Sequence, residues 1–208
     1  MLQSATVHPA TLELLKKIMQ MPLLQSFNLV GGTALSLQIG HRISVDLDLF
    51  SNQDFDNATI IRALEAVGNL AVLVDNPPFL QVRLDDVKVD MLKYPYAFVE
   101  QYNEIEGVRL VSVETIATMK LLAIARRGAK KDFFDIYFLL ERYTLAQLLA
   151  QFEKTLPYID TFHIVKSMTY FCDAEEELNP KMLIKVSWQT VKKTIEKKVE
   201  IYLRQAKI

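Results

Sequence analysis

The period of the apolar residues changes once along the 208-residue chain, near residue 112, and this change limits the available folds more than any other feature. Up to that point, apolar runs with a period of two alternate with runs of helical period. Beyond it, the helical period continues to the end. No proline- or serine-rich linker separates the two parts. The pattern therefore predicts a mixed α/β domain over residues 1–112 and a helical domain over residues 113–208.

The individual elements follow from this periodicity and from the residue types that begin and end helices and strands. Thr33 is placed to cap a helix, Gly40 to end it, and Asp85-Asp86 to join two strands as a tight hairpin. In the first part, helices are predicted over residues 8–21, 33–39 and 57–67, and strands over residues 28–30, 45–50, 70–74, 79–84, 87–92 and 107–113. In the second part, helices are predicted over residues 113–126, 130–142, 145–156, 161–171 and 188–204.

Composition excludes several protein classes. Half of the residues are apolar, which excludes disordered and fibrous chains. The net charge of −1 lacks the positive excess that DNA-binding proteins usually carry. A single cysteine, Cys172, excludes a disulfide scaffold and is expected to be buried and inert. Because the sequence shows neither a membrane-length apolar run nor a signal peptide, we expect a cytoplasmic protein without membrane or DNA-specific partners.

Two aspartates share the predicted strand 45–50. Side chains alternate along a strand, so Val45, Leu47 and Leu49 are expected to face one way and Asp46 and Asp48 the other. Two carboxylates on one strand face repel each other unless a cation lies between them. Carboxylate oxygens are hard ligands that suit Mg²⁺, which also binds substrate phosphates.

A third aspartate, Asp90, projects beside Lys88 from the predicted strand 87–92. If the two strands are neighbours, Asp46, Asp48 and Asp90 converge on one metal site. Three carboxylates there would hold Mg²⁺ for in-line phosphoryl or nucleotidyl transfer. Asp90 is also placed to accept the proton of an attacking hydroxyl.

A phosphate site is predicted upstream, where Gly31-Gly32-Thr33 joins a strand to a helix. The glycines allow a phosphate to approach the backbone, and the start of the helix offers free N–H groups. No Gly-Lys-Ser/Thr follows, so this is not a Walker P-loop. Taken singly, a glycine pair or an Asp-x-Asp is also common in turns and strand edges. The order and spacing of the two motifs together favour a site that binds phosphate and metal.

The residues between these two motifs leave alternatives open. Arg42 and Ser44 are close enough in sequence to reach a phosphate, and a guanidinium suits oxyanion binding. A structural salt bridge from Arg42 to Asp46 explains it equally well. His41 follows the helix-ending glycine and is expected to face solvent.

In the helical half, Lys120 and Arg127 share one helix face, and Asp132 and Asp135 share another. Gly128 is expected to separate the two helices. An ion pair between Lys131 and Asp135 is the purely structural alternative. With the aspartates of the first half, we favour Lys120 and Asp135 as residues of the active-site cleft.

Basic residues gather in two places. A basic knot consists of Arg126, Arg127, Lys130 and Lys131, and the tail from residue 181 has a local balance of +6, with seven Lys and one Arg against two Glu. Either is a solvated helix face or a surface for a phosphate-bearing partner.

These motifs together resemble the AbiEii/AbiGii-type nucleotidyltransferase toxins. The resemblance rests on Gly-Gly-Thr-Ala-Leu at 31–35, His-Arg-Ile-Ser-Val-Asp-Leu-Asp-Leu-Phe at 41–50, Met-Lys-Leu-Leu-Ala at 119–123 and Lys-Asp-Phe-Phe-Asp-Ile-Tyr at 131–137. It implies an α+β, polymerase β-like nucleotidyltransferase fold whose helical domain closes the active-site cleft, with NTP as co-substrate and Mg²⁺ as cofactor. Some relatives are toxins of toxin–antitoxin or phage-defence systems that act on RNA such as tRNA.

The resemblance also implies roles for individual residues. Gly31, Gly32 and Thr33 would hold the triphosphate, with Arg42, Ser44 and Lys131 as further phosphate contacts. Asp46 and Asp48, with Asp90, would bind the metal ions. Lys120 would contact the nucleotide phosphates, and Asp135 would complete the catalytic set.

These observations predict transfer of a nucleoside monophosphate from NTP to a hydroxyl of RNA, with an antitoxin protein as an expected partner. Two alternatives remain: a transferase acting on a small molecule or a protein, and a non-catalytic nucleotide-binding module. The near-neutral charge keeps the first alternative open, because tight RNA binders are usually more basic. The three retained aspartates count against the second.

Overall fold

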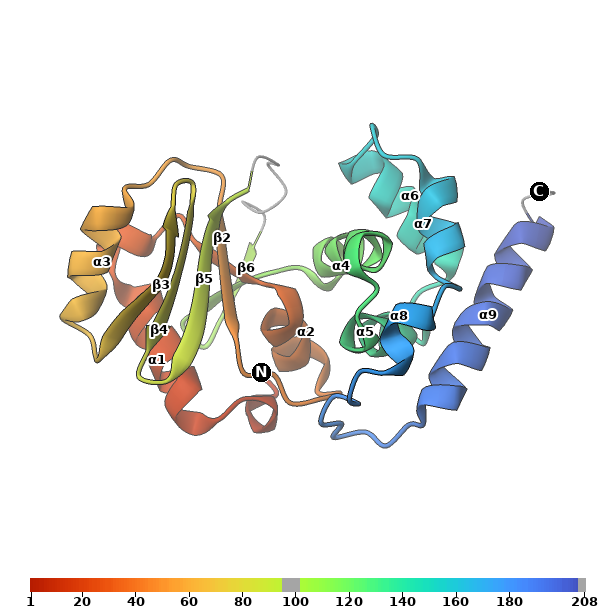
Figure 1. Cartoon of the computed structure of the whole chain (residues 1–208), viewed down its shortest axis with the longest axis horizontal. Coiled ribbons are helices and arrows are strands. Elements are labelled where there is room, and N and C mark those ends of the chain that lie inside the picture. Colours follow the sequence, from red (N-terminus) through yellow and green to blue (C-terminus); the bar gives the residue numbers. More distant parts are fainter. Residues whose placement is uncertain (95–101, 206–208) are drawn as a thin grey trace. The chain divides into compact units, whose positions relative to one another are not determined.

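The computed structural model describes residues 1–94 and 102–205. It divides into two compact units, Met1–Val113 and Glu114–Ile208, one residue from the boundary expected from the sequence. The first unit is mixed α/β and the second is helical, so the predicted fold class is confirmed (Figure 1). No helix of the described residues has the length and apolar character needed to span a membrane.

One mixed sheet organises the first unit. Among the described residues its strands lie in the order β3-β4-β5-β2-β1-β7-β6. Pairing is parallel between β5 and β2 and between β1 and β7, and antiparallel elsewhere. The strands are β1 Asn28–Val30, β2 Leu47–Ser51, β3 Leu70–Asn76, β4 Phe79–Leu84, β5 Val87–Lys93, β6 Tyr102–Ile105 and β7 Val108–Val111.

Helices flank this sheet. The helix α2 contacts β1 and β2, while α3 contacts β3 and β4 (Figure 1). Strand side chains on the covered faces, such as Leu47, Leu49, Val89 and Met91, are fully buried. The helical segments are η1 Ser4–Thr6, α1 Pro9–Gln20, η2 Pro22–Leu24, α2 Gly31–Ile39 and α3 Asn57–Glu65.

The hairpin expected at Asp85-Asp86 is confirmed. It joins β4 to β5, and both aspartates have positive φ, at 46° and 65°. Two consecutive residues with positive φ are typical of the tight turns whose twist matches that of paired strands. The Asp85 side chain also accepts a hydrogen bond from Asn69 N at 2.9 Å, which ties the turn to the start of β3.

Three expectations around α2 and β2 are wrong, and one contact explains two of them. The helix begins at Gly31 rather than at Thr33. Thr33 does not cap it but donates its hydroxyl to the main-chain oxygen of Asp46. This bond ties the backbone before β2 to α2, so the strand begins only at Leu47. Val45 lies outside it and is 64% exposed.

The third error concerns His41, which is fully buried instead of facing solvent. The N-terminal segment runs across this turn. Gln3 N donates to Leu37 O at 2.7 Å, and Ser44 N donates to Thr6 O at 2.9 Å. The turn after Gly40 is therefore part of the interior of the first unit.

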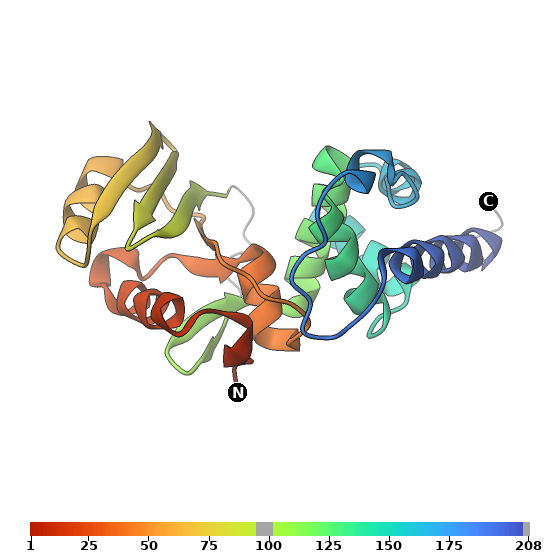
Figure 2. The same ribbon diagram turned by 60° about the horizontal axis from the view of Figure 1, so that its bottom comes forward.

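The second unit consists of helices among the residues described there. Its longest helix, α9, packs against α5 and α6 through Val191, Ile195 and Val199. The helices are α4 Val113–Arg127, α5 Lys130–Leu140, α6 Leu145–Thr155, α7 Thr161–Ser167, α8 Cys172–Glu175 and α9 Trp188–Gln205 (Figure 2).

The helix expected over residues 161–171 is divided. It ends at Ser167, and the short α8 follows from Cys172. Because α8 turns Ala174 into the interior and leaves Cys172 on the surface, the expectation of a buried thiol is wrong.

The two edges of the sheet differ in character. The edge strand β6 is four residues long and carries Glu104. The other edge, β3, is seven residues long and has no charge before Asp75. The three residues Val72, Leu73 and Val74 are 45%, 42% and 39% exposed, so apolar side chains face solvent on both sides of this strand.

Candidate active site

Asp48 reaches its position because Gly31 has no side chain. Gly31 has a φ of +69°, and a Cβ built there would lie 2.4 Å from Oδ2 of Asp48. The carboxylate thus rests on the first residue of α2. The predicted link between the glycine pair and the Asp-x-Asp segment is a direct contact in the first unit.

Arg42 occupies the corresponding place at Gly32. A Cβ at Gly32 would lie 2.4 Å from Nη2 of Arg42 and 3.4 Å from Oγ of Ser44. Arg42 and Ser44 are both buried, and Thr33 Oγ1 lies at hydrogen-bond distance, 2.8 Å, from Ser44 Oγ. The side chains that the sequence singled out around the glycines therefore gather at the start of α2.

Asp90 lies next to Asp48 in the sheet. The two residues are direct partners in the parallel pairing of β2 with β5. Both oxygens of Asp90 are engaged: Oδ1 accepts from Gln81 Nε2 at 2.9 Å, and Oδ2 lies 3.1 Å from Lys88 Nζ. The expectation that strands 45–50 and 87–92 are neighbours is confirmed.

All three aspartates affect the pKa of Lys88. Burial lowers the pKa of Lys88, but the hydrogen bond to Asp90 and the charges of Asp90, Asp46 and Asp48 outweigh burial, so its pKa lies above the ordinary value. The three carboxylates therefore create a region of negative potential around this ammonium group. A cation is favoured at this place, and here a side chain supplies it.

Asp46 lies just before β2 rather than on it. In the described parts of the chain, no three histidine, cysteine or carboxylate side chains come close enough together to form a ready-made metal cage. Mg²⁺ does not require one, since it is commonly held by one or two carboxylates together with substrate phosphates and water. The hard oxygens of Asp48 and its neighbour Asp90 fit that mode of binding.

Four charged residues form a cluster in the second unit. Lys120 Nζ lies 2.8 Å from Asp132 Oδ1 and 2.6 Å from Asp135 Oδ2. Arg127 donates from Nε and Nη2 to both oxygens of Asp132, at 2.8 and 3.1 Å. Lys120, Asp132 and Asp135 are at most 5% exposed. The shared faces expected on the two helices are confirmed, Lys120 with Arg127 on α4 and Asp132 with Asp135 on α5, and the two faces meet in this cluster.

The charges of this cluster balance one another. Burial raises the pKa of Asp132, but the charges of Lys120 and Arg127 and their hydrogen bonds lower it further, so the pKa lies below its ordinary value. Asp132 is therefore ionised at neutral pH. The alternative ion pair from Lys131 is not what holds Asp135, since Lys120 does so, and Lys131 is exposed.

The basic knot does not act as one surface. Lys130 is 5% exposed, and its Nζ donates to the main-chain oxygens of Glu175 and Glu177. Arg127 is committed to Asp132. In the tail, Lys192 pairs with Glu175 at 2.5 Å, and Lys207 lies outside the described residues. Arg126, Arg127 and Lys131 are exposed to solvent, but Arg127 is already paired with Asp132.

Sequence reasoning missed two members of the first-unit site. Lys88 was noted only as a neighbour of Asp90, and Gln81 was not noted. Gln81 stands directly opposite Asp90 in the antiparallel pairing of β4 with β5. The hairpin at Asp85-Asp86 fixes that register, so counting outward from the turn would have identified Gln81.

Comparison with protein families adds an independent result. Residues 13–204 match the model of the family described as nucleotidyl transferase AbiEii toxin, type IV toxin–antitoxin system. The chain is also 35% identical over 197 residues to an uncharacterized protein of Aquifex aeolicus, covering 92% of this chain and 95% of the relative.

Solved structures show the same fold at low identity. A candidate nucleotidyltransferase of Helicobacter pylori superposes with a TM-score of 0.60 at 18% identity, covering 94% of this chain and 92% of that one. MenT4, a nucleotidyltransferase toxin of Mycobacterium tuberculosis, gives a TM-score of 0.59 at 15% identity, covering 92% and 82%.

Proposed function

The chain belongs to the AbiEii family of nucleotidyltransferase toxins of type IV toxin–antitoxin systems, and from this we propose that it transfers a nucleoside monophosphate from NTP to a hydroxyl of RNA, with Mg²⁺ as cofactor. The family makes the chain a nucleotidyltransferase that uses an NTP. The RNA acceptor, the metal, the roles of single residues, an antitoxin partner and a cytoplasmic location are parts of the proposal.

One observation supports the proposal above all others. The carboxylate of Asp48 rests on Gly31, at the start of a helix, and Asp90 is its neighbour in the sheet. A carboxylate of the kind that suits Mg²⁺ is thereby adjacent to the backbone N–H groups of a helix start, which favour phosphate. A triphosphate bound to Gly31, Gly32 and Thr33 would share its metal with these aspartates.

The carboxylates have distinct tasks in this proposal. Asp46 and Asp48 would hold Mg²⁺, with Asp90 as the least available ligand because Lys88 and Gln81 already bind it. Bound Mg²⁺ would neutralise charge on the phosphates and orient them for in-line displacement. Arg42 and Ser44, next to Gly32, would bind phosphate oxygens.

The reaction exchanges a phosphoanhydride bond of the NTP for a phosphodiester bond to the acceptor. The acceptor hydroxyl oxygen forms a bond to the α-phosphorus, and the bond from that phosphorus to the bridging oxygen of the β-phosphate breaks. Pyrophosphate leaves with the electron pair. The hydroxyl proton passes to Oδ1 of Asp90, because Oδ2 is held by the Lys88 ammonium group, whereas Oδ1 accepts only from the neutral amide of Gln81.

The helical unit would supply further phosphate contacts. Lys120 is bound by two carboxylates, Asp132 and Asp135, and it would exchange one of them for a nucleotide phosphate. Asp135 would then complete the catalytic set, and the exposed Lys131 would add a phosphate contact. Arg127 keeps Asp132 ionised and in place during this exchange.

The test incubates the purified protein with Mg²⁺, each α-³²P-labelled NTP in turn, and total bacterial RNA. The variant is Asp46→Ala/Asp48→Ala. The control is Asp54→Ala, which removes a surface carboxylate that is 89% exposed and pairs with Lys93. We expect label on an RNA band with the wild type and the control, and none with the double variant.

Other outcomes assign other functions. Label on the protein itself would make a polypeptide the acceptor, and label released in a small molecule would favour that alternative. If NTP binds and no label is transferred to any acceptor, the transferase proposal is wrong and a nucleotide-binding module remains. Label transferred equally by the double variant would show that Asp46 and Asp48 do not hold the metal.

A further inference from the structure

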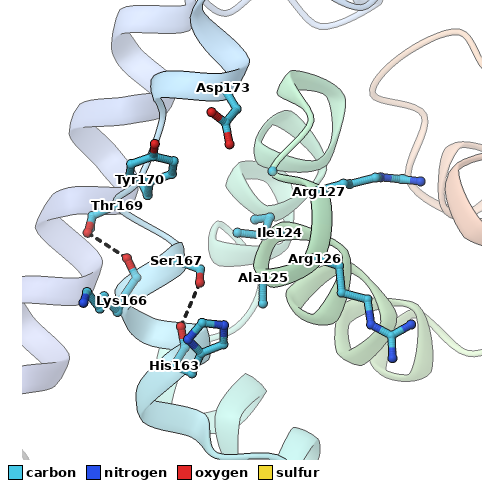
Figure 3. A pocket seen from close by; sticks show the side chains of 11 residues that line it. Ile124, Ala125, Arg126, Arg127, His163, Lys166, Ser167, Thr169, Tyr170 and Asp173 are labelled. Carbon is cyan, nitrogen blue, oxygen red and sulfur yellow. Dashed lines mark hydrogen bonds between the residues drawn. The ribbon is translucent and has the colours of Figure 1, made fainter.

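A pocket of about 440 Å³ lies entirely within the helical unit. It lies between the last turn of α4 and the segment that contains α7 and α8 (Figure 3). Ile124 and Ala125 come from α4, and His163, Ser167 and Tyr170 come from the facing segment. None of these residues was assigned chemistry by the sequence or by the proposed function. The volume is ample for one nucleoside.

The interior of this pocket suits a flat group with apolar faces and a polar edge. Ile124, only 4% exposed, and Ala125 form an apolar surface, and Tyr170 adds a phenol ring that is 55% exposed. The hydroxyl of Ser167 donates to His163 O at 2.9 Å, which fixes its oxygen as an acceptor. A nucleobase has apolar faces and a hydrogen-bonding edge, and bases stack on exposed tyrosine rings.

Cations that the fold itself does not use surround the pocket. Within the described parts of the chain, the side chains of Arg126 and Lys166 make no ion pair, in contrast to Arg127 and Lys192. The ammonium group of Lys130 is likewise occupied, by main-chain oxygens. Figure 3 shows Arg126 and Lys166 extending outward on either side of the apolar surface. Both residues lie in the last turns of helices, where a positive charge also interacts favourably with the negative end of the helix dipole. The helix dipole therefore explains why these two residues are positively charged, but it does not explain why a pocket lies between them.

The pocket is also connected to the groups that we assign to phosphate binding. Arg127 lines it, and the Arg127 guanidinium binds Asp132, which in turn binds Lys120. A ligand in the pocket therefore lies one residue away from the buried charged cluster. The pocket is thereby adjacent to the phosphate contacts that we assign to the helical unit.

We propose that this pocket binds one unpaired nucleoside of the acceptor RNA, with its base between Ile124 and Tyr170 and the adjoining phosphates at Arg126 and Lys166. That this RNA is the acceptor of the reaction rests on the proposed function. The binding site itself is inferred from the geometry of the pocket alone. The ligand class is single-stranded RNA. A duplex does not fit, because its bases are paired and stacked and cannot enter.

The test measures binding of a fluorescein-labelled, mixed-sequence single-stranded oligoribonucleotide of about 12 nucleotides to the full-length protein, with neither NTP nor Mg²⁺ present. Arg126→Glu/Lys166→Glu removes the two rim cations, and Tyr170→Ala removes the ring. The matched control is Lys193→Glu/Lys197→Glu on α9, which changes the net charge by the same amount at two exposed lysines. Circular dichroism establishes that each variant is folded.

The two pocket variants should differ in their salt dependence. Reversing Arg126 and Lys166 should weaken binding by at least tenfold and reduce the slope of log K against log salt by about 1.4, the value for two lost phosphate contacts on a single strand. Tyr170→Ala should weaken binding about 5- to 100-fold and leave the slope unchanged, because stacking does not release counterions. The control should change the affinity less than threefold.

Three outcomes would overturn the proposal. An equal loss in the control would mean that RNA follows net charge alone. Unchanged RNA affinity in both pocket variants would exclude the pocket, and so would a wild type that binds no RNA. Because NTP is absent, failure of the transfer reaction leaves this result unaffected, and the two proposals fail separately.

Discussion

The position of the Asp48 carboxylate depends on Gly31, which has no side chain. At Gly31 the backbone has a φ of +69°, which costs an L-residue roughly 1–2 kcal/mol, and a Cβ would collide with Oδ2 of Asp48. Backbone strain and collision are separable, because Gly107 has a similar φ of +78° with nothing within 4 Å of its Cβ position.

We therefore expect Gly31→Ala and Gly107→Ala to have similar effects on stability and different effects on ligand binding. Each should lower the free energy of unfolding by about 1–2 kcal/mol. Only Gly31→Ala should weaken binding of Mg²⁺·NTP, by at least about tenfold, because it displaces Asp48. Urea denaturation and isothermal titration calorimetry provide the two measurements. Equal NTP affinities would contradict the role of Asp48 in the nucleotide site.

Asp132 stabilises the helical unit in a pH-dependent way. Its pKa in the folded protein lies below the ordinary value of 3.8, despite burial, because of Lys120 and Arg127. A lowered carboxyl pKa gives stability that is present above pH 3.8 and lost as the pH falls through the folded value. The relevant window is therefore acidic.

Asp132→Asn tests this contribution. At pH 7 it should lower the free energy of unfolding by about 3 kcal/mol, because it removes the charge that pairs with the buried Lys120 and with the partly exposed Arg127. The wild type should lose stability steeply below pH 3.8, and the variant should lose less over the same range. Urea denaturation at pH 7 and pH 3 measures both values. If the wild type and the variant differ in free energy of unfolding by the same amount at both pH values, Asp132 is not the titrating group.

The positions of single residues could be predicted from the sequence where a local pattern indicated them. Alternation placed Asp48 and Asp90 on their strands, and helical spacing placed Lys120 with Arg127 and Asp132 with Asp135. Arg109 could not be found this way. It is buried and donates to the main-chain oxygens of Phe27, Met19 and Leu24 at 3.2, 2.8 and 2.9 Å. These partners lie more than eighty residues away in sequence, so no local pattern reports them.

At the scale of elements, the period identified most helices and strands but not all of their ends. A tertiary contact set some boundaries: the Thr33 hydroxyl holds the backbone at Asp46 and delays β2. The strand β6 was missed because Tyr102–Ile105 has no apolar alternation and gains its place by pairing with β7. The register of Gln81 opposite Asp90 depended on a turn that the sequence did identify.

One side-chain hydrogen bond connects the first turn of α4 to the turn that follows α5. Tyr143 donates to Glu114 Oε1 at 2.7 Å, and burial, followed by this bond, raises the pKa of Tyr143 to about 12. A raised tyrosine pKa gives stability that is present below pH 10 and lost as the pH rises through 12.

A spectrophotometric titration at 295 nm should therefore contain a component near pH 12 that Tyr143→Phe removes. Glu114→Gln should move this component toward lower pH without restoring 10, because burial remains. If the high-pH component persists in Tyr143→Phe, another tyrosine produces it and the link between the helices is weaker than described.

At the scale of the whole molecule, each compact unit has a core of its own. Fully buried strand residues such as Leu49 and Met91 belong to the first, and Phe133, Phe134 and Phe152 to the second. The change in apolar period near residue 112 predicted this organisation, because sheet and helix cores require different spacing. It carried no information on which residues of either unit take part in the reaction.

Residues 1–113 should consequently fold without the rest of the chain. We expect a cooperative thermal transition and retained affinity for Mg²⁺·NTP, but no transfer to RNA, because Lys120 and Asp135 are absent. Calorimetry and the labelled-transfer assay measure these properties, with the full chain as reference. A non-cooperative transition would show that the first unit depends on the second for its stability.

The apolar edge of β3 separates two properties that are often treated as one. Resistance to unfolding depends on the buried cores, whereas the behaviour of a concentrated solution depends on what its molecules present to each other. A strand with unpaired main-chain groups and exposed valines invites pairing between copies. A charged residue at Val72 would leave the melting temperature nearly unchanged and keep a concentrated stock clear for longer.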